Sequence, residues 1–97
     1  MDEIIEMTFD SADGIIDCRL DPLRNENELF YSATILYPNT VNGFSRSEIY
    51  CHNLRRSTKN GGYIFEKGEE AIHPKIKKLE TQISDVIAQV LQSKIKN

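Results

Sequence analysis

The residues able to do metal or redox chemistry are few and lie far apart in this sequence. They are Cys18, Cys51, His52 and His73. Zinc sites usually bring their cysteines in closely spaced pairs such as Cys-x-x-Cys, and no such pair occurs here. We therefore predict no metal and no other cofactor, and we expect both cysteines to be free thiols.

His52 is the strongest candidate for a general base, because imidazole titrates near neutral pH. A catalytic histidine also needs a nucleophile and an orienting carboxylate beside it, and no spacing in the chain indicates either. The segment Gly43-Phe44-Ser45-Arg46-Ser47 lacks the second glycine of a nucleophile elbow, and the sequence has no phosphate-binding glycine loop. We predict a protein that is not an enzyme and has no catalytic residues; an enzyme that uses His52 is the weakest alternative.

A basic cluster stands out among the remaining side chains. Arg55, Arg56 and Lys59 lead into a glycine turn, Asn60-Gly61-Gly62. Guanidinium groups bind phosphate, turn N–H groups bind anions, and aromatic rings stack on bases. The aromatic residues nearest in sequence are Phe44, Tyr50 and Tyr63. A nucleic-acid-binding module that uses this cluster is our alternative function.

The distribution of charge argues against that alternative. Nucleic-acid-binding domains are usually basic, whereas this chain has a net charge of −3. Residues 1–30 contain nine acidic side chains and two arginines, and residues 44–67 contain five basic and two acidic ones. The acidic first third should repel a polyanion and should lie in solvent.

The elements that must position these residues follow from hydrophobic periodicity. Alternation of apolar and polar residues predicts five strands. The expected strands cover residues 3–10, 14–20, 28–37, 44–55 and 63–65. Residues 21–27 are polar, contain a proline and should form a loop. Pro38 should end the third strand, and residues 39–43 should form a turn with Asn42-Gly43 at its exit.

The period changes to 3.6 after Gly68, which should end the fifth strand. Pro74 suits the first position of a helix, and the apolar residues that follow fall on one helical face. This pattern predicts a helix over residues 74–95. We expect a single α+β domain over residues 1–97, an antiparallel five-stranded β-meander with one long C-terminal α-helix packed on one sheet face.

The third strand indicates a surface for a partner. It is apolar on both sides, whereas a single helix covers only one face of a sheet. Phe30, Leu36 and Tyr50 would then lie on the open sheet face, where a contiguous apolar patch marks a partner surface. The helix, about 33 Å long, also exceeds the width of the sheet, about 19 Å. We predict a small non-enzymatic protein-interaction module that self-associates through this face as a homodimer.

Length and composition set the class of protein. The chain has 97 residues, of which 39% are hydrophobic and 28% charged, as in a globular protein with one core. No apolar run approaches the length of about 18 residues needed to cross a membrane. The first residues are acidic and do not resemble a signal peptide. We therefore expect a cytoplasmic protein without a membrane partner.

Overall fold

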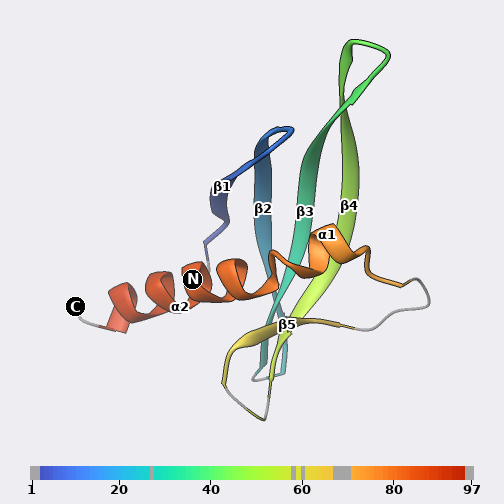
Figure 1. Ribbon diagram of the computed structural model, residues 1–97. Helices are drawn as coiled ribbons and strands as arrows, with labels where there is room; N and C mark the ends of the chain where they lie inside the picture. Colours follow the sequence, from blue (N-terminus) through green and yellow to red (C-terminus); the bar gives the residue numbers. More distant parts are fainter. Residues whose placement is uncertain (1–2, 27, 58, 60, 67–70, 96–97) are drawn as a thin grey trace. The chain divides into compact units, whose positions relative to one another are not determined.

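The computed structural model describes residues 3–26, 28–57, 59, 61–66 and 71–95 (Figure 1). For residues 94 and 95 it describes the backbone alone. Five strands form an antiparallel meander in the order β1-β2-β3-β4-β5, and the C-terminal helix follows them. The predicted α+β class and the order of the elements are confirmed. The residues group into two compact units, Met1–Asn53 and Leu54–Asn97, which we describe in turn.

The first unit contains β1 (Ile5–Ser11), β2 (Gly14–Asn25), β3 (Glu28–Val41) and most of β4 (Phe44–Arg56). Residues directly opposite one another share a face of the sheet, so the register defines two faces. Leu20 lies opposite both Ile5 and Ala33, and Cys18 lies opposite Ile35. The buried face consists of Ile5, Ile16, Cys18, Leu20, Tyr31, Ala33 and Ile35. Met7 and Phe9, opposite Cys18 and Ile16, lie on the same face, and the residues that alternate with these make up the exposed face.

The loop predicted for residues 21–27 is wrong for residues 21–25, because β2 continues to Asn25 and Pro22 lies opposite Tyr31. Glu26 is a turn residue, and Asn27 lies outside the described residues. In an antiparallel ladder, successive residues direct their N–H groups to alternate sides. The strand pairing puts the N–H position of Pro22 on the side of β1, whose pairing with β2 starts only at Leu20. The missing donor of Pro22 therefore costs the sheet no hydrogen bond, and the strand passes through it.

The same geometry corrects the prediction for Pro38, because β3 continues to Val41. The N–H position of Pro38 faces β2, and the pairing of β2 with β3 stops one step before it, at Asp17 and Leu36. Pro38 thus ends the ladder to β2 but not the strand. Beyond it, β3 and β4 continue as a two-stranded ribbon.

The turn predicted for residues 39–43 is wrong for residues 39–41, which continue β3, and only Asn42-Gly43 forms the turn between β3 and β4. Both residues have positive φ, 52° and 79°, which is the conformation of the two-residue hairpin turn that this dipeptide favours. A two-residue turn places Val41 opposite Phe44. The amide nitrogen of Asn39 donates a hydrogen bond of 2.6 Å to Glu48, so these two side chains share a face.

The second unit contains β5 (Tyr63–Phe65), α1 (Pro74–Lys77) and α2 (Glu80–Ile95). Strand β5 pairs with the last three residues of β4, and α2 packs on β5. The predicted helix is present as these two segments, because the N–H of Leu79 bonds to the carbonyl of Ile76, three residues back instead of four. The buried residues of this segment are Ile76 in α1, Leu79 between the helices, and Ile83 and Ile87 in α2.

Gly68, which was expected to end the fifth strand, lies outside the described residues. Within the described part of the chain, no helix is both long and apolar enough to cross a membrane.

Candidate interaction surface

Large apolar side chains gather on the exposed face of the first unit. Ile15 and Ile49 are the most accessible of them, at 61% and 66% exposed. The face also carries Leu23 directly opposite Phe30, and Leu36 opposite Asp17. Side chains this apolar are costly to leave in water over a contiguous area, and such areas mark contacts with other proteins.

Charged side chains on the same face are mostly acidic. On β1 and β2 they are Glu6, Asp10, Asp17, Arg19 and Asp21. Arg19 lies opposite Glu6 and forms an ion pair of 3.2 Å with Asp21. Because four carboxylates meet one guanidinium on these two strands, the exposed face favours a ligand with positive charge.

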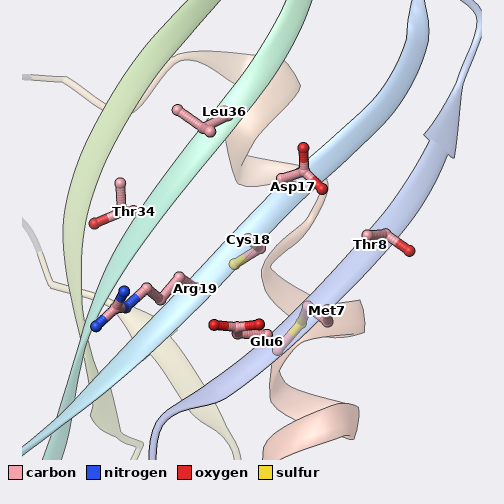
Figure 2. A pocket seen from close by; sticks show the side chains of 8 residues that line it. All are labelled: Glu6, Met7, Thr8, Asp17, Cys18, Arg19, Thr34 and Leu36. Carbon is pink, nitrogen blue, oxygen red and sulfur yellow. The ribbon is translucent and has the colours of Figure 1, made fainter.

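A shallow hollow of about 500 Å³ lies in this face (Figure 2). Two cross-strand rows of side chains border it, one through Arg19 and the other through Asp17. The row between them turns its side chains to the buried face, as the burial of Cys18 shows. The lining residues are Glu6, Met7, Thr8, Asp17, Cys18, Arg19, Thr34 and Leu36. The hollow can receive a side chain that combines an apolar stem with a polar or cationic end.

Of the three predicted surface residues, the structure places two on the exposed face, six residues apart along β3. Phe30 and Leu36 are half-buried on the exposed face. Tyr50 lies on the opposite face, because its hydroxyl donates a 2.5 Å hydrogen bond to Glu48, which Asn39 also contacts. Asn39 alternates with the buried Ile35 at an even spacing and so shares its face.

Two residues of the exposed face, Ile15 and Ile49, were not predicted. Each belongs to an adjacent apolar pair, Ile15-Ile16 and Ile49-Tyr50. One member of any adjacent pair in a strand must point away from the core. Such pairs are the sequence signal that would have identified both residues.

The basic cluster of the alternative function is spread out in the second unit. Arg55 and Arg56 are adjacent strand residues, opposite Ile64 and Tyr63, and therefore point to opposite sides. Lys59 lies in the following turn, where its backbone N–H donates to the Ser57 hydroxyl at 3.2 Å. All three basic residues are exposed, but the strand separates the two arginines. The predicted stacking residue Tyr63 is buried.

The cysteines are both free, and they differ in environment. Cys51 is exposed, whereas Cys18 is buried and its pKa is raised by desolvation to about 12. His52 is half-buried in β4, and His73 caps α1 by accepting a hydrogen bond from the N–H of Lys75 at 3.2 Å. Among the described residues, no three or more histidine, cysteine or acidic side chains are grouped so that they could hold a metal ion.

No protein-family model matches this chain, and no curated protein and no solved structure shows significant similarity to it. The case for its function therefore comes from the exposed face and from the free edges of the strands.

Proposed function

We propose that this protein is a small non-enzymatic protein-interaction module that acts as a homodimer, and that its exposed face binds a partner protein. One observation carries the proposal: the exposed face combines accessible apolar residues with an excess of carboxylates. Its large apolar residues are Ile4, Ile15, Leu23, Phe30, Leu36 and Ile49. Burial of one such side chain stabilises a complex by up to about 1.5–3 kcal/mol.

The same composition defines the partner. A complementary segment carries apolar side chains next to lysine or arginine, since Glu6, Asp10 and Asp17 would attract them. A second copy of this face would instead set carboxylates against carboxylates. We therefore assign partner binding to the exposed face and place self-association at another part of the molecule.

Nucleic-acid binding finds less support in the geometry. The exposed face of β1 and β2 is acidic, and Arg55 and Arg56 point to opposite sides of their strand. Binding to phosphates requires several cations along one path.

The test compares three immobilised forms of the chain as baits in cell lysate: the wild type, Ile15→Glu, and Arg55→Glu with Arg56→Glu. Ile15 is 61% exposed, so its replacement leaves the buried face intact. We expect a protein that the wild type and the double variant retain equally, that nuclease does not release, and that Ile15→Glu retains at least tenfold less.

Two results would contradict the proposal. Equal retention by the wild type and Ile15→Glu would exclude the exposed face. Release by nuclease, together with loss of retention in the double arginine variant, would favour the nucleic-acid alternative.

A further inference from the structure

The free edges of the strands differ in how they are covered. The outer edge of β5 is closed by side chains of α2. The hydroxyl of Ser84 accepts a hydrogen bond from the N–H of Tyr63 at 2.9 Å, and the carboxylate of Glu80 accepts one from the N–H of Phe65 at 2.8 Å. Both N–H groups point away from β4 and already have acceptors in α2, so they are not available to pair with a further strand.

The outer edge of β1 is protected by charge. The closing pair of its hairpin, Ser11 and Gly14, fixes which residues bond to β2. The residues whose backbone points outward are therefore Glu6, Thr8 and Asp10. A second β1 paired symmetrically about Thr8 would set Glu6 against Asp10, and like charges directly opposite one another are destabilising.

Among the described residues of the first unit, none gives the edge of β4 either protection. Strand β5 pairs with β4 only through Leu54, Arg55 and Arg56. Among the described residues, no other strand follows β4 in the sheet. The two-residue turn makes Phe44 bond to β3, so alternate residues direct their N–H and C=O groups outward. The outward-directed residues are Ser45, Ser47, Ile49, Cys51 and Asn53.

This assignment agrees with two independent observations. Arg55 continues the outward series, and it is the central residue of the pairing with β5. The side chains of the outward series are exposed throughout, from Ser45 to Asn53. A row of five unprotected backbone positions without proline or charge is a template for another strand.

We propose that a second copy of this chain pairs with this edge, β4 against β4 in antiparallel orientation, about a twofold axis through Ile49. This proposal rests on the self-association in the proposed function and gives it a location. Ile49 then lies opposite Ile49 of the second copy, Ser47 opposite Cys51, and Ser45 opposite Asn53. All five outward residues are paired, which forms about ten hydrogen bonds between the two strands.

Charge favours the register with the axis at Ile49 over the register with the axis at Glu48. A shift of the axis to Glu48 would place two carboxylates directly opposite one another. With the axis at Ile49, Glu48 lies opposite Tyr50 and Arg46 lies opposite His52, and the pairing stops at Asn53, before β5 begins.

A third register, with the axis at Ser47, sets Arg46 opposite Glu48. It pairs Cys51 with the turn residue Gly43 and leaves Asn53 without a partner. Glu48 already accepts hydrogen bonds from Asn39 and Tyr50. The Arg46–Glu48 ion pair would therefore stabilise the dimer by less than the lost backbone hydrogen bonds destabilise it, since exposed pairs contribute at most about 1 kcal/mol.

The symmetry has a consequence for partner binding. A twofold axis perpendicular to the sheet keeps the two exposed faces on the same side. The two copies then present one continuous acidic and apolar surface, and one partner can contact both.

Cross-linking tests the register. In a Cys51→Ser background, Ile49→Cys places two thiols at a Cα separation of about 5.5 Å, which a disulfide spans. Ser47→Cys in the same background is the matched control, because its two copies are separated by about 13 Å along the strand. We expect mild oxidation to give a covalent dimer with Ile49→Cys and a monomer with Ser47→Cys. The proposal would be overturned if only Ser47→Cys gave a covalent dimer, or if neither variant gave one.

The dimer dissociation constant, measured by light scattering and sedimentation, gives a second test. Ser47→Pro removes an outward donor but keeps the ladder to β3, and we expect it to weaken the dimer at least tenfold. Thr8→Pro removes an outward donor at the edge of β1 and should leave the dimer dissociation constant unchanged. Circular dichroism verifies that both variants fold. Equal dimerisation of Ser47→Pro and the wild type would overturn the proposal.

The outcome also separates this inference from the proposed function. A monomeric wild type that still loses its partner in Ile15→Glu would end the β4 inference and leave partner binding intact. If Ile49→Cys forms the covalent dimer but the wild type retains no protein more strongly than Ile15→Glu does, the β4 inference stands and partner binding by the exposed face is excluded.

Discussion

At the level of single residues, the two cysteines differ because one side chain faces the protein interior and the other faces solvent. Cys18 alternates with Ile16 and Leu20 on the buried face, whereas Cys51 lies on the exposed side of β4. Burial disfavours the thiolate and raises the pKa of Cys18 from 9.0 to about 12. Since the thiolate is the reactive form, the two thiols should behave as separate classes.

We predict that a thiol reagent at about pH 8 modifies one cysteine per native chain and two per unfolded chain. Cys51→Ser should abolish the reaction of the native protein, because only the buried thiol remains. Absorbance of the released chromophore measures both stoichiometries. Rapid modification of two thiols in the native wild type would show that Cys18 is accessible.

The raised pKa of Cys18 also predicts a pH dependence of stability. Between pH 9 and 12 the unfolded chain releases the thiol proton and the folded chain retains it. The free energy of unfolding therefore falls as pH rises through this window, by at most about 1.4 kcal/mol per pH unit from this group. Urea unfolding at several pH values should show a shallower dependence for Cys18→Ala; equal slopes would argue against the shift.

At the level of elements, the short strand β5 depends on α2. Three residues form a marginal strand, and α2 supplies acceptors for the two N–H groups that β5 directs away from β4. Glu80 has a second contact, an ion pair of 2.8 Å with Lys77. Its carboxylate thus joins the edge of the sheet to the start of α2 and to α1.

We predict that Glu80→Ala lowers the free energy of unfolding by about 1–3 kcal/mol, because it leaves the N–H of Phe65 without its acceptor. Glu80→Gln keeps a carbonyl acceptor and should recover most of this loss. Thr81→Ala, at an exposed neighbouring position, is the control. Urea unfolding gives the comparison, and equal midpoints for Glu80→Ala and Thr81→Ala would contradict the prediction.

At the level of the whole molecule, charge should decide which macromolecules bind. The net charge is −3, and the acidic side chains are concentrated in residues 1–30. Over a screening length of about 8 Å, a domain this small does not conceal them from a bound polyanion.

We predict no binding to single-stranded oligonucleotides tighter than about 10 μM at about 150 mM salt, measured by fluorescence anisotropy. Replacing Arg55, Arg56 and Lys59 together by glutamate adds negative charge and should weaken any residual binding further. A submicromolar affinity that falls steeply with salt and disappears in the triple variant would restore the nucleic-acid alternative.

The sequence by itself determined the elements and their order. Alternating residues marked the five strands, Asn42-Gly43 marked the long hairpin, and the change of period at Pro74 marked the helical segment. These signals are local, since side-chain direction repeats every two residues in a strand and every 3.6 in a helix. Cys18 alternates with Ile16 and Leu20 in the sequence, and all three are buried in the structure.

Only the tertiary structure decided which backbone groups and which side chains each strand directs toward its neighbours. The effect of Pro22 and Pro38 depends on which side their N–H positions face, and that is fixed by strand register. The adjacent residues Ile49 and Tyr50 are both apolar enough for either face, and the contacts of Glu48 decide between them. The free edge of β4 exists because β5 is short and pairs only from Leu54 onward. Pairing between strands is non-local, so no pattern within one strand determines it.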